Sequence, residues 1–172
     1  MPEGGIVTEY GKYGTVRKIL LYAALGIWTS AAALTFRTFV QGSAYVSGQS
    51  MRPTYITGDA AAYTPGRLPE RYECAVFTAA PYGETCIKRI YGLPGETVEI
   101  RKGVLYINGK ETDDPFSDGK TDFGPLTLGK DEYFAMGDNR TRSTDSRSAE
   151  AGTVNRYLIT GTVRKSGYGE NG

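Results

Sequence analysis

The sequence predicts a mainly β domain, a small coiled sheet or barrel, preceded by one N-terminal transmembrane helix. Short runs of alternating apolar and polar residues recur after residue 59, and Gly, Pro or Asn bound most of them. The chain contains 23 glycines and 13 tyrosines, a balance that favours short strands joined by tight turns over a helical bundle. Near the N-terminus lies one uncharged run that is long enough for a membrane span.

The composition also excludes several classes of protein. A chain of 172 residues suits one domain with an appendage and can bury a core without disulfide bonds. The formal net charge of +1, with acids and bases interspersed, gives no reason to expect a nucleic-acid partner. Two cysteines and no histidine cannot form an ordinary zinc site. We therefore expect neither a metal nor another cofactor.

The uncharged run covers residues 19–36 and directly follows Arg17 and Lys18. At about 1.5 Å per residue, a helix of this run reaches roughly 27 Å, enough for a thin or untilted crossing. Positive charge before a span places that end in the cytoplasm. We therefore expect a cytoplasmic segment over 1–18, a transmembrane anchor over 19–36 and an extracytoplasmic domain over 37–172, in a single-pass protein of the cell membrane.

Two other interpretations of this run stay open. Residues 31–33 are three alanines, which supply a small-x-small site, so the run would also suit a cleaved secretory signal. A buried core helix is the weaker alternative because the run has no polar face. A mature chain that starts near Leu34 would contradict the anchor.

Strands are predicted in chain order from alternation and from the turns that flank it. The first covers 60–64 after a turn at Gly58, and the next two cover 72–78 and 85–91, joined by a turn at 81–83. All three are short, as expected for a compact β domain.

The middle of the chain predicts a β-meander. Strands at 98–101 and 104–107 flank the dipeptide 102–103, and the dipeptide 108–109 gives a second tight turn. Residues 110–130 are acidic and interrupted by Gly and Pro, so we expect an extended loop with one short strand at most. The remainder predicts a strand at 132–136, a polar loop over 137–152 and a last strand at 156–164 before a frayed tail.

One serine stands in a setting that suits a nucleophile. Ser50 lies between Gly48 and Pro53, so we expect its hydroxyl on a turn rather than inside a strand. A serine hydroxyl needs a base within hydrogen-bond reach, and this chain has no histidine. The base must be a lysine or a carboxylate, and Lys88, in the apolar-flanked run 86–91, is a candidate. Taken alone, Lys88 would suit an exposed strand position better.

Three segments resemble the successive sequence boxes of type I signal peptidases. They are SMRPT at 50–54, IKRIYGLPGETVEI at 87–100 with LYINGK at 105–110, and GDNRTRSTDSR at 137–147. Their order and spacing, and the hydrophobic run before them, agree with that family from about Ser43 to Val163. The resemblance implies a membrane-anchored serine endopeptidase of the compact form, with a mostly β fold and a Ser/Lys dyad.

Within that resemblance, Ser50 corresponds to the nucleophile and Lys88 to the general base. A lysine can act as a base only as the neutral amine, so its pKa has to fall well below its usual value of about 10.4. Burial can supply that shift, and Ile87, Ile90 and Met51 are the expected apolar neighbours.

The third box supplies residues that support the dyad. Ser143 corresponds to a serine whose hydroxyl orients the lysine amine. Asp145 and Arg147 correspond to a carboxylate and a guanidinium that brace the site. By the same resemblance, Arg89 is expected to pair with Asp138 and to fix the loop against the lysine strand.

The oxyanion and substrate sites also follow from the resemblance. Many family members carry Ser or Thr at the position of Gly48, where the hydroxyl donates to the oxyanion. Here the Ser50 N–H and the room left by Gly48 remain, and the second donor stays open. Met51, Cys86 and Ile87 are expected to line shallow pockets that admit small side chains.

The two cysteines, Cys74 and Cys86, leave two alternatives. An extracytoplasmic domain permits a disulfide bond between them. The predicted strands do not force the two side chains opposite each other, so free buried thiols are equally compatible with the sequence.

We expect an enzyme that removes N-terminal signal peptides from exported preproteins after a small-x-small site. Its expected partners are those preproteins, membrane lipid and the protein-export channel, and no nucleic acid. A conjugative-pilus maturation peptidase, or a tethered β-domain that binds exported chains without catalysis, are alternatives. A self-cleaving repressor fits less well, because it would need a DNA-binding helix pair where this chain has its hydrophobic run.

Overall fold

The computed structural model describes residues 10–39, 41–79 and 83–164, and within the N-terminal helix it describes the side chains of residues 16–32. The chain separates into two compact units, Met1–Val40 and Gln41–Gly172. The predicted C-terminal tail and most of the predicted turn at 81–83 lie outside the described residues.

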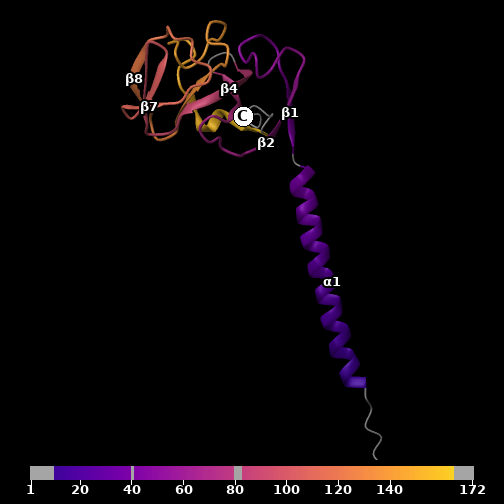
Figure 1. Ribbon diagram of the computed structural model, residues 1–172. Helices are drawn as coiled ribbons and strands as arrows, with labels where there is room; N and C mark the ends of the chain where they lie inside the picture. Colours follow the sequence, from indigo (N-terminus) through magenta and orange to yellow (C-terminus); the bar gives the residue numbers. More distant parts are fainter. Residues whose placement is uncertain (1–9, 40, 80–82, 165–172) are drawn as a thin grey trace, which may run out of the picture. The chain divides into compact units, whose positions relative to one another are not determined.

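Helix α1 covers Tyr10–Phe39 and is drawn in indigo in Figure 1. It therefore begins well before Arg17 and includes the whole of the predicted run. Its described side chains are exposed, including Leu20, Ile27 and Trp28. The prediction of a helix over 19–36 is confirmed. The prediction that this helix spans a membrane is not, because no helix in the described part of the chain is both long and apolar enough to do so.

The second unit contains a seven-stranded antiparallel sheet and a smaller one of four strands (Figure 1). The large sheet has the order β1-β2-β11-β3-β4-β9-β10. Its strands are β1 (Gly42–Tyr45), β2 (Ala60–Pro65), β3 (Cys74–Ala79), β4 (Glu84–Gly92), β9 (Glu132–Met136), β10 (Val154–Asn155) and β11 (Ile159–Val163).

The small sheet has the order β7-β6-β5-β8. Its strands are β5 (Thr97–Arg101), β6 (Val104–Ile107), β7 (Lys110–Thr112) and β8 (Phe123–Thr127). The first three form the predicted meander. Lys102 and Gly103 have φ values of 50° and 80°, which are the positive values that a tight two-residue hairpin requires.

The largest buried cluster joins the two sheets. It takes residues from β4 and β9 of the large sheet and from β5 and β6 of the small one. Its members are Tyr91, Val98, Ile100, Leu105, Ile107, Leu128, Phe134 and Met136. Full burial of side chains of this size contributes about 1.5–3 kcal/mol each, so this cluster packs the small sheet firmly against β4 and β9.

Most predicted strands are confirmed, including 60–64, 85–91 and 132–136, and three details of the prediction are wrong. The strand expected from residue 72 begins at Cys74, because Tyr72 has a φ of 68° that is incompatible with a strand. Residues 110–130 contain two short strands, β7 and β8, rather than one at most. The last segment starts as a short 3₁₀ helix, η1 (Arg156–Leu158), and becomes strand only at Ile159.

Candidate active site

Ser50 begins a turn of five residues between β1 and β2. The turn is closed by a hydrogen bond from Tyr55 N–H to the Met51 carbonyl at 2.9 Å. Gly48 enters it with a φ of 94°, which a glycine adopts without strain. The Gly48 N–H donates to Thr57 Oγ1 at 3.2 Å, and that hydroxyl donates back to the Gly48 carbonyl at 2.9 Å. Ser50 is therefore displayed on a turn that is fixed at both ends.

The backbone N–H groups of Ser50 and Gly48 differ in their hydrogen bonding. Among the described residues, none accepts a hydrogen bond from it. This donor therefore remains available to a bound molecule, whereas the Gly48 N–H is already engaged by Thr57.

The loop that follows β9 holds the Ser50 turn in place. Asn139 N–H donates to the Ser50 carbonyl at 2.9 Å, and Asn139 Nδ2 donates to the Gln49 carbonyl at 3.1 Å. Gly137 lies so close that a Cβ there would come within 2.5 Å of the Ser50 carbonyl oxygen and nearer still to Ser143 Oγ. Only glycine at 137 lets the two segments meet this closely.

Lys88 lies in β4, opposite Ala75 of the neighbouring β3. Its side chain is buried, with 7% of the residue exposed. Burial lowers the pKa of Lys88 below that of an ordinary lysine, while the charge of Asp145 opposes this effect. The amine is therefore closer to its neutral form than that of a surface lysine.

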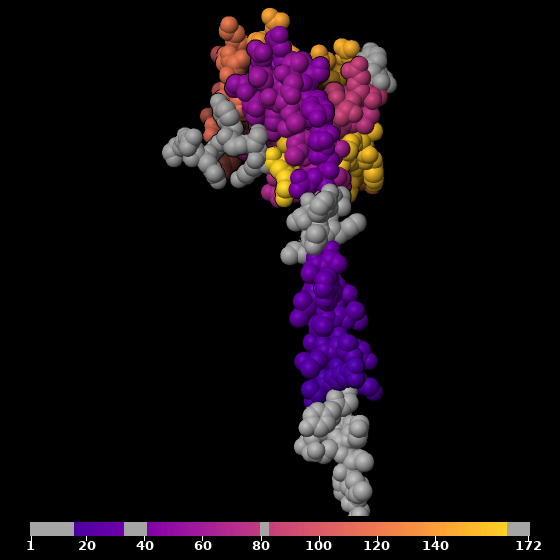
Figure 2. Space-filling view, turned by 90° about the vertical axis from the view of Figure 1, so that its right-hand side faces the viewer, coloured from indigo at the N-terminus to yellow at the C-terminus, as the bar shows by residue number. Residues whose placement is uncertain are grey.

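Ser50 and Lys88 line the same groove, which has a volume of about 540 Å³. The three residues expected to form substrate pockets, Met51, Cys86 and Ile87, line it as well. The segment from β1 to the Ser50 turn also contributes to the groove, and the chain from about residue 41 to 60, in purple, makes up much of the face turned to the viewer in Figure 2. The fold thus brings together five residues that lie up to 38 positions apart in the chain.

Asp145 is buried beside this site and is held by charged hydrogen bonds. Arg147 donates to its two oxygens from Nε at 2.8 Å and from Nη2 at 2.9 Å, and Gly137 N–H donates at 2.9 Å. Although burial alone would raise it, these bonds keep the pKa of Asp145 below its usual value. Asp145 is therefore a permanent negative charge near Lys88.

The Ser143 hydroxyl is buried against Gly137. It lies near enough to Asp145 to help lower the pKa of that carboxyl. It does not, however, reach hydrogen-bonding geometry with any described residue. A buried hydroxyl in this condition is available to a partner that the described residues do not supply.

Arg89 and Asp138 form the expected ion pair. Arg89 Nε and Nη2 donate to the two oxygens of Asp138 at 2.8 and 2.7 Å, and the Asp138 side chain is fully buried. Thr54 completes the cluster by donating its hydroxyl to Asp138 and accepting from Arg89. Together with Thr54, this ion pair links β4, the Ser50 turn and the loop after β9.

Two supporting interactions were missed by the sequence analysis. Arg140 and Asp114 form a buried pair with two hydrogen bonds of 2.6 and 2.7 Å. Ser146 exchanges hydrogen bonds with the backbone of Ala135, both at 3.0 Å. The charged Arg140 inside the third box indicated that an acidic partner was needed. Nothing in the local sequence, however, identifies Asp114 as that partner.

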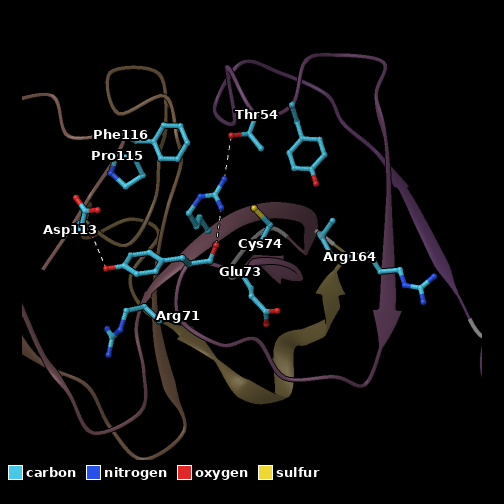
Figure 3. Close-up of a pocket in the computed structure, with 12 residues that line it drawn as sticks. Thr54, Arg71, Glu73, Cys74, Asp113, Pro115, Phe116 and Arg164 are labelled. Carbon is cyan, nitrogen blue, oxygen red and sulfur yellow. Dashed lines mark hydrogen bonds between the residues drawn. The ribbon is translucent and has the colours of Figure 1, made fainter. Parts of the chain in front are cut away.

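The cysteines are free thiols, which settles the alternative left open above. In the ladder between β3 and β4, Cys74 lies opposite Arg89 and Cys86 opposite Phe77, so the two are not cross-strand neighbours. Cys74 lines a separate pocket of about 330 Å³, together with Thr54, Phe116 and Arg164 (Figure 3). Burial raises the pKa of Cys74 to about 12, so its thiol is unreactive.

Over residues 10–39, 41–79 and 83–164, no group of three or more Cys, Asp or Glu side chains is arranged to hold a metal ion. The arrangement around Ser50 suits acyl transfer, with a displayed serine, a buried lysine and a backbone N–H that no described residue engages. This combination is compatible with a serine hydrolase that uses an amine in place of an imidazole.

Comparisons with known proteins agree with this class. The family model of signal peptidase, peptidase S26, matches residues 19–167. A signal peptidase I of Bacillus amyloliquefaciens is 34% identical over 91% of this chain and 92% of its own. Signal peptidase I S of Bacillus subtilis is 34% identical over 86% of this chain and 88% of its own.

A solved structure agrees as well. The crystal structure of a signal peptidase I from Enterococcus faecalis superposes with a TM-score of 0.51 at 33% identity, and covers 57% of this chain and 98% of its own. The chain belongs to the signal peptidase family, peptidase S26.

Proposed function

We propose that Ser50 and Lys88 are the nucleophile and the general base of this signal peptidase. The chain is a serine endopeptidase that cleaves signal peptides. One observation carries the assignment of the two residues: the serine on its fixed turn and the buried lysine line a single groove, in a chain without histidine.

The acylation step follows from this arrangement. The neutral amine of Lys88 takes the proton of Ser50 Oγ while Oγ attacks the carbonyl carbon of the scissile peptide bond. The carbonyl oxygen gains negative charge, which the free Ser50 N–H stabilises. Collapse of this intermediate breaks the C–N bond, and the proton held by Lys88 passes to the leaving amine. Gly48 contributes the space in which the carbonyl oxygen approaches.

The supporting residues hold the amine of Lys88 in position. Ser143, whose hydroxyl has no partner among the described residues, orients Lys88 by accepting a hydrogen bond from its amine once substrate is bound, which leaves the lone pair of the nitrogen for Ser50. Asp145, braced by Arg147, fixes the segment that carries Ser143. The pair of Arg89 and Asp138 fixes the strand that carries Lys88.

Specificity for small side chains is proposed to come from the groove walls. Met51 is buried, and Ile87 and Cys86 are half-buried, so little depth remains beside the dyad. Shallow walls exclude bulky side chains and admit alanine, which suits cleavage of exported preproteins after a small-x-small site.

We also propose that residues 19–36 anchor the enzyme in the cell membrane, with residues 1–18 in the cytoplasm and the domain from residue 37 outside. The family is membrane-associated, and the uncharged run behind Arg17 and Lys18 supports this topology. Membrane lipid and the export channel would then lie beside the enzyme. Detergent dependence of the full-length protein and protease protection of its N-terminus test the topology; release of an intact protein by salt alone would contradict it.

The test of the dyad is cleavage of a peptide with an Ala-x-Ala site by the detergent-solubilised full-length protein. We expect one cut after the second alanine, reduced by several orders of magnitude in both Ser50→Ala and Lys88→Ala, because the two residues act as a unit. Lys130→Ala, which changes an exposed lysine, is the matched control. Cleavage that survives both changes would refute the dyad, and a folded protein without any cleavage would indicate a tethered binding domain.

A further inference from the structure

Glu84 is an acidic residue in the wall of the groove that holds Ser50 and Lys88. It is the first residue of β4, and the strand continues from it to Lys88 in unbroken register with β3. At about 3.3 Å per residue, the four steps from Glu84 to Lys88 span roughly 13 Å. The carboxylate therefore lies along the groove, well away from the reacting atoms.

The groove takes its negative charge from Glu84. Of the described residues that line it, Glu84 is the one acid and Lys88 the one base of the Lys and Arg type. A general base acts in its neutral form, so the groove carries a net negative charge when Lys88 is ready to react. A cation in the substrate would meet this charge.

The Glu84 carboxylate is exposed, and no lysine or arginine in the described part of the chain forms an ion pair with it. Its charge is nevertheless felt within the groove wall. Burial raises the pKa of Cys86, the charge of Lys88 lowers it, and the charge of Glu84 raises it. The carboxylate thus acts on the groove and remains open to a partner from outside the chain.

Two segments line the groove, and both lead toward the dyad. Strand β1 and the residues after it lead to Ser50, and β4 leads to Lys88. The walls that select small side chains before the scissile bond lie beside the dyad, so earlier residues of the substrate extend toward Glu84. An extended peptide advances at nearly the same rate as β4, which places Glu84 level with about the fourth to the sixth residue before the scissile bond.

We propose that Glu84 selects signal peptides with a lysine or arginine at about the fourth to the sixth residue before the scissile bond. The proposal rests on the proposed dyad and on the small-residue walls. The substrate cation pairs with the Glu84 carboxylate, which takes no part in the bond-making steps. Exposed ion pairs contribute little in water, so we expect a preference of about twofold to fivefold in kcat/KM.

The test uses peptides that share one Ala-x-Ala site and differ at a single position. Lys, Gln or Glu is placed at the fourth, fifth or sixth residue before the scissile bond. For each full-length enzyme, kcat/KM for the Lys peptide and for the Glu peptide is divided by kcat/KM for the Gln peptide, so a general loss of activity cancels. For the wild type we expect a Lys ratio of about two to five and a Glu ratio below one.

Glu84→Gln should bring both ratios to about one, and Glu84→Lys should reverse them in favour of the Glu peptide. Glu111→Lys is the matched control. It changes the net charge by the same amount at an exposed glutamate that does not line the groove, and it should keep the wild-type ratios. High salt should weaken the wild-type preference, because exposed charges are screened.

Each outcome bears on one proposal. Wild-type ratios of one at all three positions, or ratios that persist in Glu84→Lys, would overturn the role of Glu84 and leave the dyad intact. An equal reversal in Glu111→Lys would overturn it too, since overall charge would then be responsible. Cleavage that survives in Ser50→Ala would overturn the dyad. Binding of the same peptides to the Ser50→Ala protein tests Glu84 without the reaction, and tighter binding of the Lys peptide that Glu84→Lys abolishes is expected.

Discussion

Asn139 binds the nucleophile turn twice, through its backbone N–H to the Ser50 carbonyl at 2.9 Å and through Nδ2 to the Gln49 carbonyl at 3.1 Å. The loop after β9 therefore sets the position of Ser50 relative to Lys88.

Asn139→Asp removes the Nδ2 donor and keeps the size of the side chain. We expect kcat to fall about threefold to thirtyfold with little change in KM, because the turn loosens while the groove persists. The net loss in unfolding free energy should be about 0.5–1.5 kcal/mol, as for one hydrogen bond. Steady-state kinetics and thermal unfolding give the two values. Arg142→Ala, which changes an exposed side chain of the same loop, is the control, and equal loss in both variants would contradict a specific role for Nδ2.

Gly137→Ala tests the close contact of the two segments. The added methyl would meet Ser143 and the Ser50 carbonyl, and backbone cannot move aside as a flexible side chain does. We expect kcat to fall at least a hundredfold. Gly129→Ala is the comparison, because its methyl would meet only the flexible Glu132 side chain. Activity of Gly137→Ala near that of Gly129→Ala would show that the contact is not needed.

Ser143→Ala should lose activity without loss of stability. The Ser143 hydroxyl has no partner among the described residues, so its removal leaves no described group unsatisfied. We expect kcat to fall tenfold or more while the Tm stays within about 1 °C or rises. Ser146→Ala provides the contrast, because it strands the buried Ala135 N–H and should cost about 1–3 kcal/mol. A large drop in Tm for Ser143→Ala would mean that the hydroxyl has a structural role.

The pH dependence of activity should reflect the neutral form of Lys88. Burial lowers its pKa, Arg147 acts in the same direction, and Asp145, Cys86 and Asp138 oppose it. We expect kcat/KM to rise about tenfold per pH unit up to that pKa and to level off below the pH at which an ordinary lysine titrates. A profile that still rises at the usual pKa of lysine would contradict this.

The same pKa shift predicts how stability depends on pH. The folded state binds the Lys88 proton less tightly than the unfolded state, so stability rises with pH between the folded and the unfolded pKa. Lys88→Met removes the buried charge and should therefore raise the Tm at neutral pH. Thermal unfolding of both proteins over a pH series measures this, and the gain should shrink as the pH approaches the usual pKa of lysine.

Removing only one partner of the ion pair between Arg89 and Asp138 should lower the unfolding free energy substantially. Asp138→Asn leaves the buried guanidinium without its partner, and we expect a loss of about 3–5 kcal/mol. The double variant with Arg89→Met should lose less than the sum of the two single variants, since the second change removes the unpaired charge. Chemical denaturation of the wild type, the two single variants and the double variant gives the four unfolding free energies for this comparison. Glu99→Gln, which breaks an exposed pair with Arg101, should leave Tm unchanged, and strict additivity at Arg89 and Asp138 would contradict the coupling.

Much of the secondary structure followed from local pattern. The strands at 98–101 and 104–107 were predicted from alternation around a turn, and both are present because alternation and turn geometry act over a few residues. Tyr72 shows the limit of this approach: its aromatic side chain favours a strand, but the tertiary structure holds its backbone at a positive φ.

The sequence by itself determined the chemistry that is open to this protein. Without histidine, a displayed serine must rely on a lysine or a carboxylate, and the sequence boxes indicated Lys88. Only the tertiary structure decided that Lys88 is buried, that Asn139 holds Ser50, and that Arg140 meets Asp114. Burial and pairing depend on strand register and on contacts between segments far apart in the chain, whereas the patterns that a sequence displays arise from neighbours within a few residues.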